Sequence, residues 1–337
     1  MMRFKLVTVA LAGLLSQAVI ASQVNVYSAR QESLIKPLLD QFTSETGVVV
    51  NLIAGNGNEL LKRMQTEGIA SPADVFITVD AGNLHAAKEA GVYQPIQSAL
   101  LEQRIPSKLR DLDGAWVGLT QRARPIFYAK DRVDPATLST YEALADEAWK
   151  GRVCIRSSGN IYNQSLVASM IEHSGAEATR QWATAFVKNF ARKPAGGDTD
   201  QLRAVAAGQC DVAISNTYYY GRLADSAKPE DRKVYDALGV FWPNQADRGV
   251  HINVSGAVLA KHAKNIAEAL QLMEFMASDQ AQAHYARINH EYPVVPGAPI
   301  SDTIAAFGPF KADDLNLTAL GVNNRRAVQL MDQAGWQ

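Results

Sequence analysis

The stretch Val212-Ala213-Ile214-Ser215-Asn216-Thr217-Tyr218-Tyr219-Tyr220 sets the interpretation of the whole chain, because a short apolar run leads directly into three adjacent tyrosines. The apolar run is typical of a buried strand. Consecutive side chains on a strand point to opposite faces, so adjacent tyrosines cannot share one surface of a flat sheet. They can converge where the backbone turns from a strand into a helix. We therefore expect Tyr218 and Tyr219 at a strand-to-helix junction.

Paired tyrosines suggest two kinds of site. A phenol has a pKa of about 10, so it is a poor ligand near neutral pH. A highly charged cation reverses this by stabilising the phenolate, and a hard anionic oxygen suits a hard cation. One hypothesis is that Tyr218 and Tyr219 bind ferric iron. The alternative is that they line a pocket for a sugar or an amino acid, or only pack, and the tyrosine run alone favours this alternative.

The first 21 residues have the pattern of a secretory signal peptide. Arg3 and Lys5 precede an apolar run from residue 6 to 18, and cleavage is expected near Ala21. No other apolar run is long enough to span a bilayer, so we expect an exported protein that is not embedded in the membrane. Without Arg3 and Lys5 the formal net charge of −1 becomes −3. This balance argues against nucleic acid as a partner.

The chain has two cysteines, Cys154 and Cys210. An even number of cysteines in an exported chain favours a disulfide. The alternative is a pair of buried thiols, because spacing alone does not fix the distance between the two residues.

Strands and helices alternate along the chain. The first unit has predicted strands at 24–27, 48–53 and 73–79, with predicted helices at 32–46, 59–68 and 83–90. The second unit has predicted strands at 153–155 and 212–214, with predicted helices at 161–173, 177–188 and 199–207. A late strand at 251–259 precedes a mostly helical remainder. This rhythm predicts two α/β units in series, and the mature length fits two domains.

Polar residues directly follow several of the predicted strands. In open α/β sheets, ligands bind outside the carboxyl ends of the strands, and small-ligand sites lie preferentially between domains. We therefore expect a cleft between the two units. The groups expected to face it are Gln31, residues 56–58, Asp80, Arg122, residues 157–162, and Tyr218 with Tyr219.

Five segments give the chain a resemblance to a known family. They are residues 24–30 (VNVYSAR), 71–80 (SPADVFITVD), 120–124 (TQRAR), 156–164 (RSSGNIYNQ) and 216–219 (NTYY). The chain resembles the periplasmic ferric-iron-binding proteins, the transferrin-like FbpA/FutA group of type II periplasmic binding proteins. The resemblance covers essentially the whole mature chain, and the last two segments together are its most specific part. It implies an α/β fold of two lobes, with the ligand cleft between them.

The resemblance also implies roles for individual residues. Tyr218 and Tyr219 match the paired iron-binding tyrosines, and Tyr162 matches a third tyrosine ligand of one subgroup. Arg122 matches the arginine that holds a synergistic anion, here expected to be carbonate or bicarbonate. The turn that hydrogen-bonds this anion matches Ser158, Gly159 and Asn160. An alternative for Tyr162 is a helix residue that packs on the cleft wall, and an alternative for Arg122 is a salt bridge in the hinge.

The chain departs from the family in the first lobe. Gln31 stands where some members have a histidine ligand, and Val79 stands where they have a glutamate ligand. We therefore expect the first lobe to supply no direct ligand, with Gln31, Asn58 and Asp80 as candidates for contacts to the anion or to water. Three phenolates would neutralise Fe(III), and Arg122 would offset part of the anion's charge through its bidentate geometry.

The family also implies lobe boundaries and partners. The first lobe is expected to hold residues 22–123 and 248–298, and the second lobe residues 124–247 and 299–337. The expected function is that of a monomeric receptor that delivers Fe(III) to an inner-membrane ABC permease. Two rival functions stay open. One is a receptor for an organic solute or an oxyanion, and the other is an exported hydrolase.

Other candidate sites are weaker. His284, His290 and Glu291 form a possible metal cluster, but we expect them at a solvated helix end away from the cleft. The sequence has no zinc-protease motif, no Gly-x-Ser-x-Gly motif and no phosphate-binding loop. No general base adjoins Ser157 and Ser158 in the sequence, so the chain is not expected to be an enzyme.

Overall fold

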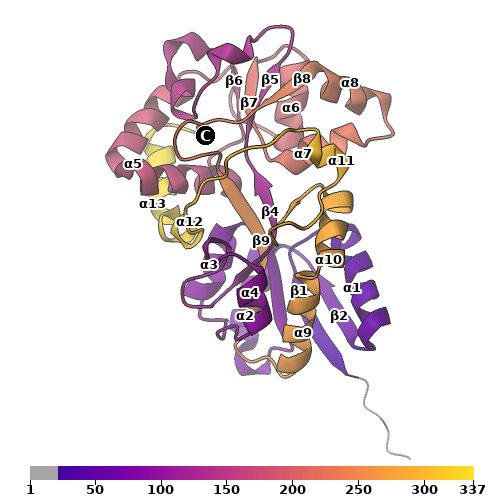
Figure 1. The fold of residues 1–337 in the computed structure, drawn as a ribbon. Helices are drawn as coiled ribbons and strands as arrows, with labels where there is room; N and C mark the ends of the chain where they lie inside the picture. The colour runs from indigo at the N-terminus through magenta and orange to yellow at the C-terminus, as the bar shows by residue number, and fades with distance from the viewer. Residues whose placement is uncertain (1–21) are drawn as a thin grey trace, which may run out of the picture.

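The computed structural model describes residues 22–337, so the predicted signal peptide and its cleavage near Ala21 lie outside the described residues. The chain forms two sheets, each covered by helices, in the lower and upper lobes of Figure 1. The prediction of two α/β units is confirmed. Within the described residues, no helix is long and apolar enough to cross a membrane.

The first lobe is built on a six-stranded mixed sheet. Its strands, in spatial order, are β10 (Tyr292–Pro293), β4 (Val117–Ala123), β9 (Ile252–Leu259), β3 (Val75–Val79), β1 (Gln23–Ser28) and β2 (Val49–Ala54). β1 pairs in parallel with β2 and β3, whereas β9 is antiparallel to β3 and β4. Every residue of β9 is buried, including the polar Asn253 and Ser255. The helices of this lobe are α1 (Glu32–Thr46), α2 (Gly57–Glu67), α3 (Ala81–Glu89), α4 (Ala99–Arg104), α9 (Ile266–Met276) and α10 (Asp279–His284).

The second lobe is built on a four-stranded sheet. Its strands, in spatial order, are β6 (Val153–Cys154), β7 (Val212–Ile214), β5 (Ile126–Ala129) and β8 (Leu238–Phe241). Its helices are α5 (Ile161–Val187), α6 (Asp198–Ala206), α7 (Thr217–Ala224), α8 (Pro229–Ala237), α11 (Asp302–Ala305) and α13 (Asn324–Gln333). The two helices predicted at 161–173 and 177–188 form α5, which breaks at Gly175, where φ is 80°. A disulfide joins Cys154 to Cys210, as predicted.

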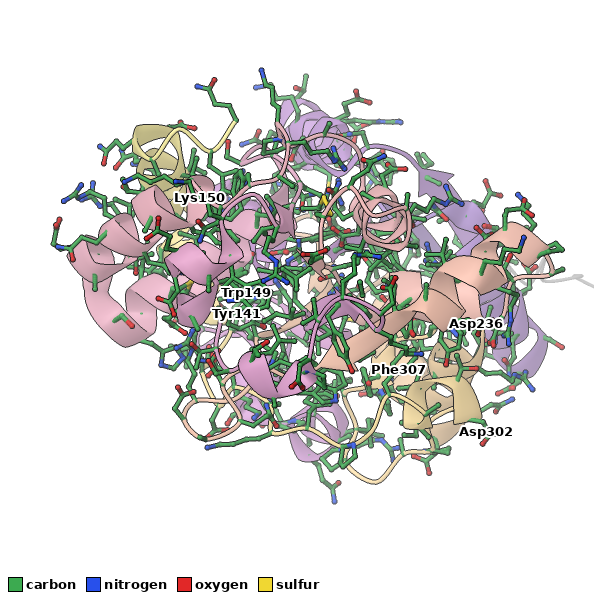
Figure 2. All side chains as sticks on the ribbon, turned by 90° about the horizontal axis from the view of Figure 1, so that it is seen from above. Tyr141, Trp149, Lys150, Asp236, Asp302 and Phe307 are labelled. Atoms are coloured by element: carbon green, nitrogen blue, oxygen red, sulfur yellow. A yellow bond between two sulfur atoms is a disulfide. The ribbon has the colours of Figure 1, made fainter. Side chains whose placement is uncertain are left out.

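Three segments of the chain cross between the lobes. The first is the short link from β4 to β5, and the second runs from β8 to β9 (Figure 1). The third follows β10 and pairs with the second, where the amide of Val250 donates to the Lys311 carbonyl at 2.9 Å. Tyr141, labelled in Figure 2, ties two of these segments to the second lobe. Its hydroxyl donates to the Arg124 carbonyl at 2.8 Å and accepts from the His251 amide at 3.2 Å.

The C-terminal helices connect the two lobes a fourth time. α12 (Thr318–Val322) packs against α3 of the first lobe, and α13 packs against α5 of the second. Gly321 allows the close approach of α12, since a side chain there would overlap His85 of α3. The C-terminal helices therefore hold the two lobes in contact along one side of the molecule, at the left of Figure 1.

Candidate ligand-binding site

The tyrosine pair lies where the sequence predicts, at the junction of a strand and a helix. β7 ends at Ile214, Asn216 is the extended residue before the helix, and α7 begins at Thr217. The rings of Tyr218 and Tyr219 lie 4.4 Å apart between centroids, and both line one cavity. Tyr220 points away from it and packs, as expected. Its hydroxyl donates to the Leu238 carbonyl at 2.8 Å.

Tyr162 reaches the same cavity from a different helix. It lies in the first turn of α5, where the Asn160 side chain accepts a hydrogen bond from the Tyr162 amide at 3.2 Å. This cap holds the start of the helix in place. The three tyrosines proposed as ligands from the sequence are thus brought together, although Tyr162 stands 56 positions before Tyr218 in the chain.

The cavity has a volume of about 190 Å³ and lies between the lobes. The second lobe contributes the three tyrosines and Arg222. The first-lobe residues that line it are Ala29, Arg30, Gln31, Leu34, Val79, Arg122 and Glu291. Gln31 and Val79, which replace ligands of some family members, therefore do face the tyrosines. Among the described residues, no group of three or more His, Cys, Asp or Glu side chains could hold a metal ion, which leaves the tyrosines as the cluster of oxygen donors.

Arg122 has the geometry of an anion-binding group. It is 2% exposed, and its Nη2 donates to Ser255 Oγ at 3.0 Å. Its Nε and Nη1 have no hydrogen-bond partner within residues 22–337. Buried donors without partners are costly, so two of them on one guanidinium at a cavity wall favour a bound anion. Within residues 22–337, Arg122 forms no salt bridge, unlike Arg30 and Arg124.

A second buried arginine at the cavity is already neutralised. Arg30 Nη2 lies 2.7 Å from Glu291 Oε2, and both side chains are buried. Burial opposes the charge of Glu291, but the guanidinium groups of Arg30 and Arg122 hold its pKa below the usual value. Of the two buried arginines at the cavity, Arg30 is therefore paired, whereas Arg122 has free donors that are available to a ligand.

Tyr162 and Tyr218 are neutral phenols in the absence of a cation. Burial and the neighbouring Tyr219 raise the pKa of Tyr162 to about 12. Burial, followed by the charges of Tyr162 and Tyr219, raises the pKa of Tyr218 well above its ordinary value. A ligand that uses these oxygens as phenolates must therefore carry enough positive charge to displace their protons.

Other predicted site residues lie elsewhere. Ser158, Gly159 and Asn160 form the turn before α5 but do not line the cavity, and Asn58 is exposed on α2. Asp80 is buried, and its Oδ1 accepts a hydrogen bond from Ser165 Oγ at 2.5 Å. Because Asp80 follows β3 and Ser165 belongs to α5, this hydrogen bond joins the two lobes.

Three charged lining residues were not assigned to the site from the sequence: Arg30, Arg222 and Glu291. The expectation that Glu291 lies at a solvated helix end away from the cleft is wrong. β10 pairs with β4 through Tyr292 and Gln121, and this pairing carries Glu291 into the cavity. His290 is also buried, at 6% exposure, beside Gly221 of α7. The position of Arg30 shortly after the end of the first strand was the sequence signal that could have identified it as a site residue.

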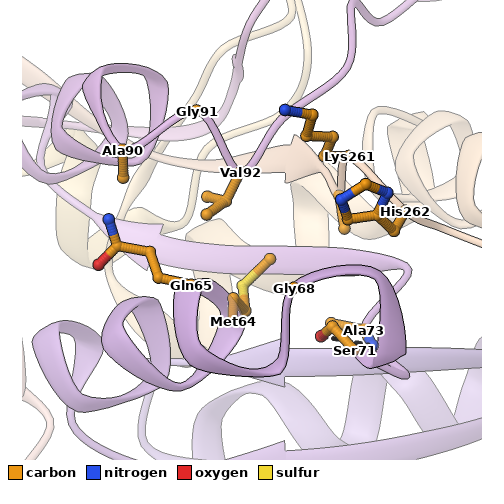
Figure 3. Close-up of a pocket in the computed structure, with 11 residues that line it drawn as sticks. Met64, Gln65, Gly68, Ser71, Ala73, Ala90, Gly91, Val92, Lys261 and His262 are labelled. Carbon is orange, nitrogen blue, oxygen red and sulfur yellow. Dashed lines mark hydrogen bonds between the residues drawn. The ribbon is translucent and has the colours of Figure 1, made fainter.

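A second cavity, of about 340 Å³, lies at the opposite end of the first sheet. Figure 3 shows that its polar lining residues, Gln65, Ser71, Lys261 and His262, lie around the side chains of Met64 and Val92. Among the described residues, its lining has one histidine and no carboxylate. The tyrosine cavity, on which tyrosine, arginine and glutamate side chains converge, is therefore the better candidate for the functional site.

Two α/β lobes joined by crossing segments, with a polar cavity between them, define the class of two-lobed solute-binding proteins. The family described as bacterial extracellular solute-binding protein matches residues 27–283. The chain therefore belongs to this family.

Comparison with individual proteins shows similarity to this chain over nearly its whole length. The iron uptake protein A1 of Synechocystis sp. is 49% identical, over 94% of this chain and 88% of the relative. The Fe(3+)-binding periplasmic protein of Serratia marcescens is 30% identical, over 95% and 93% of the two chains. A solved structure of Trichodesmium FutA (IdiA), in complex with iron and citrate ligands, has a TM-score of 0.91 at 49% identity, covering 94% of this chain and 100% of that one.

Proposed function

We propose that this protein is a periplasmic receptor that binds Fe(III) and delivers it to an inner-membrane ABC permease. The observation that carries the proposal is the convergence of Tyr162, Tyr218 and Tyr219 on one interlobe cavity. The iron-related names of relatives that cover nearly the whole chain support the same cargo.

The proposed ligands are the three phenolate oxygens. Three phenolates carry three negative charges, which match the charge of Fe(III), and hard oxygen ligands suit this ion. The high pKa values of Tyr162 and Tyr218 mean that each must lose a proton when the metal binds. Binding of a weakly charged solute would not offset the free-energy cost of losing these protons. The site therefore selects for a highly charged cation.

Arg122 is the proposed holder of a synergistic anion. Its Nε and Nη1 are buried donors without partners among the described residues, and either can donate a hydrogen bond to an oxyanion. We propose carbonate or bicarbonate as this anion. The turn formed by Ser158, Gly159 and Asn160 directly precedes α5 and is the proposed second contact to the anion.

The first lobe closes the site without supplying a metal ligand in this proposal. Gln31 and Val79 replace the ligands of some family members, and Glu291 is committed to Arg30. We propose the lobe boundaries predicted from the sequence, 22–123 with 248–298 and 124–247 with 299–337. The Asp80 to Ser165 hydrogen bond stabilises contact between the lobes.

A receptor for an oxyanion or an organic solute is the second candidate, because Arg122 could bind an anion without any metal. Absorption separates the two. A ferric phenolate absorbs visible light by charge transfer from oxygen to iron. Protein stripped of metal and then supplied with Fe(III) and bicarbonate should become coloured, in a one-to-one ratio. A protein that stays colourless while binding carbonate or another oxyanion would support the second candidate.

A further inference from the structure

Arg124 lies behind the tyrosines, in the shortest of the crossing segments. It stands between β4 and β5, and its side chain is 1% exposed inside the second lobe. Its Nη1 donates to Asn216 Oδ1 at 3.0 Å and to Asp198 Oδ2 at 3.0 Å. Its Nη2 donates to Asn163 Oδ1 at 2.7 Å. Asn216 immediately precedes α7, which carries Tyr218, and Asn163 adjoins Tyr162 on α5.

The arginine fixes which way both asparagine amides face. A guanidinium has only donors, so each asparagine must turn its carbonyl oxygen toward Arg124 and its amide nitrogen away. The nitrogen of Asn216 then donates to Tyr218 Oη at 3.2 Å. The nitrogen of Asn163 donates to the Arg156 carbonyl at 2.9 Å. The oxygen of Tyr218 is therefore an acceptor in this bond, and a phenolate can fill that role without a proton.

Asp198 supplies the charge that keeps the arginine in place. Asp198 is fully buried and pairs with Arg124. It also accepts a hydrogen bond from the backbone amide of Asn216 at 3.2 Å. A buried arginine that lacked this partner would be strongly unfavourable. The carboxylate thus holds both the guanidinium and the backbone from which α7 starts.

We propose that Arg124 and Asn216 are positioning residues for the iron site. Through Asn216, Arg124 orients the oxygen of Tyr218, and through Asn163 it fixes the start of the helix that carries Tyr162. The side chain of Arg124, in the crossing segment between β4 and β5, thereby positions both helices that carry the tyrosines. This inference rests on the proposed function, because it concerns the same site.

The hydrogen bond from Asn216 has a spectroscopic consequence. It withdraws electron density from the oxygen of Tyr218. If that bond is lost, the phenolate is more easily oxidised, and its charge-transfer band with Fe(III) moves to longer wavelength. A side chain that only stabilises the fold would alter the unfolding midpoint without moving this band.

Asn216→Asp is the sharpest variant, because it keeps the shape and the acceptor toward Arg124 but removes the donor toward Tyr218. Asn216→Ala leaves the Arg124 to Asp198 pair intact and guards against misfolding of the first variant. The matched control is Asn189→Asp. Asn189 is also buried in the second lobe, but its amide donates to the carbonyls of Leu144 and Asp146.

The full-length mature protein is loaded with ferric nitrilotriacetate and bicarbonate, and the visible band and iron affinity are measured. Both Asn216 variants should shift the band to longer wavelength and lose about tenfold or more in affinity. Asn189→Asp should change neither. Unchanged band and affinity in both Asn216 variants would overturn the inference, whereas wild type without a band would overturn the proposed function.

A double-mutant cycle then tests whether Asn216 acts through Tyr218. If it does, Asn216→Asp should cost little further affinity in the Tyr218→Phe background, because the oxygen that it orients is already gone. Arg124→Lys should move the band in the same direction as Asn216→Asp, since lysine keeps the charge but lacks the planar fork. Additive losses in the cycle would contradict the proposed positioning role.

Discussion

Arg30 and Glu291 lie 261 positions apart in the chain and form a buried ion pair at the wall of the tyrosine cavity, with 2.7 Å between Nη2 and Oε2. The pair joins the end of the first strand to the segment that returns after α10. Among the described residues, Glu291 is the carboxylate that lines the cavity, and it is paired with Arg30 before any ligand binds.

Breaking this pair should affect stability more than iron binding. Glu291→Gln leaves Arg30 buried without a counter-ion and should lower the free energy of unfolding by about 3 kcal/mol or more, measured by urea denaturation. The double variant Arg30→Met, Glu291→Leu should recover most of the loss. Iron affinity of Glu291→Gln should fall much less than that of Tyr218→Phe. A loss as large as that of the tyrosine variant would make Glu291 a ligand from the first lobe.

Arg122 should control how iron retention depends on the anion. Arg122→Ala removes the two buried donors that lack partners, so iron should bind more weakly and should respond far less to added bicarbonate. The measurement is a titration with Fe(III) at several bicarbonate concentrations. Arg110→Ala, at a residue outside the cavity, is a suitable control. If the bicarbonate response of Arg122→Ala equals that of wild type, Arg122 does not hold the anion.

The raised pKa of Tyr162 predicts a loss of stability at alkaline pH. The folded protein holds this proton up to a pKa of about 12, whereas an unfolded tyrosine releases it near 10. The unfolded state therefore loses protons first, and stability falls as pH rises through the window between these values. Metal-free Tyr162→Phe should show a shallower fall in the unfolding midpoint than wild type. Parallel curves for the two proteins would contradict the assignment.

The hydrogen bond between Asp80 and Ser165 should bias the lobes toward contact. Ser165→Ala removes a partner from a buried carboxylate that sits at a left-handed φ of 79°. The contact should weaken by about 1 kcal/mol or more, so that metal-free protein samples a more open form. Small-angle scattering should give a larger radius of gyration. Ser169→Ala is the control, because Ser169 bonds only within α5, to the Leu166 carbonyl. Identical scattering for Ser165→Ala and wild type would show that this hydrogen bond does not hold the two lobes together.

The two α/β units could be predicted because their strands are short and rich in apolar residues and their helices have regular apolar spacing. The junction at Ile214 to Thr217 was also predictable, since adjacent tyrosines need a turn of the backbone to converge. The position of Glu291 was not. It depends on a two-residue strand, Tyr292–Pro293, that is too short to have a pattern of its own. The contacts of Arg124 were equally hidden, because they join residues from five separate segments.

Removal of single phenol oxygens tests the central claim most directly. Tyr218→Phe, Tyr219→Phe and, as the matched control, Tyr220→Phe are loaded with ferric iron and bicarbonate, and the visible charge-transfer band is recorded with the affinity. Phenylalanine keeps the ring and removes the oxygen. Tyr220→Phe should lower stability by about 1 kcal/mol, through its lost hydrogen bonds to carbonyls, and keep the full band. The account predicts that Tyr218→Phe and Tyr219→Phe each fold normally and lose most of the band and of the iron affinity. Full colour and full affinity in both variants would contradict it.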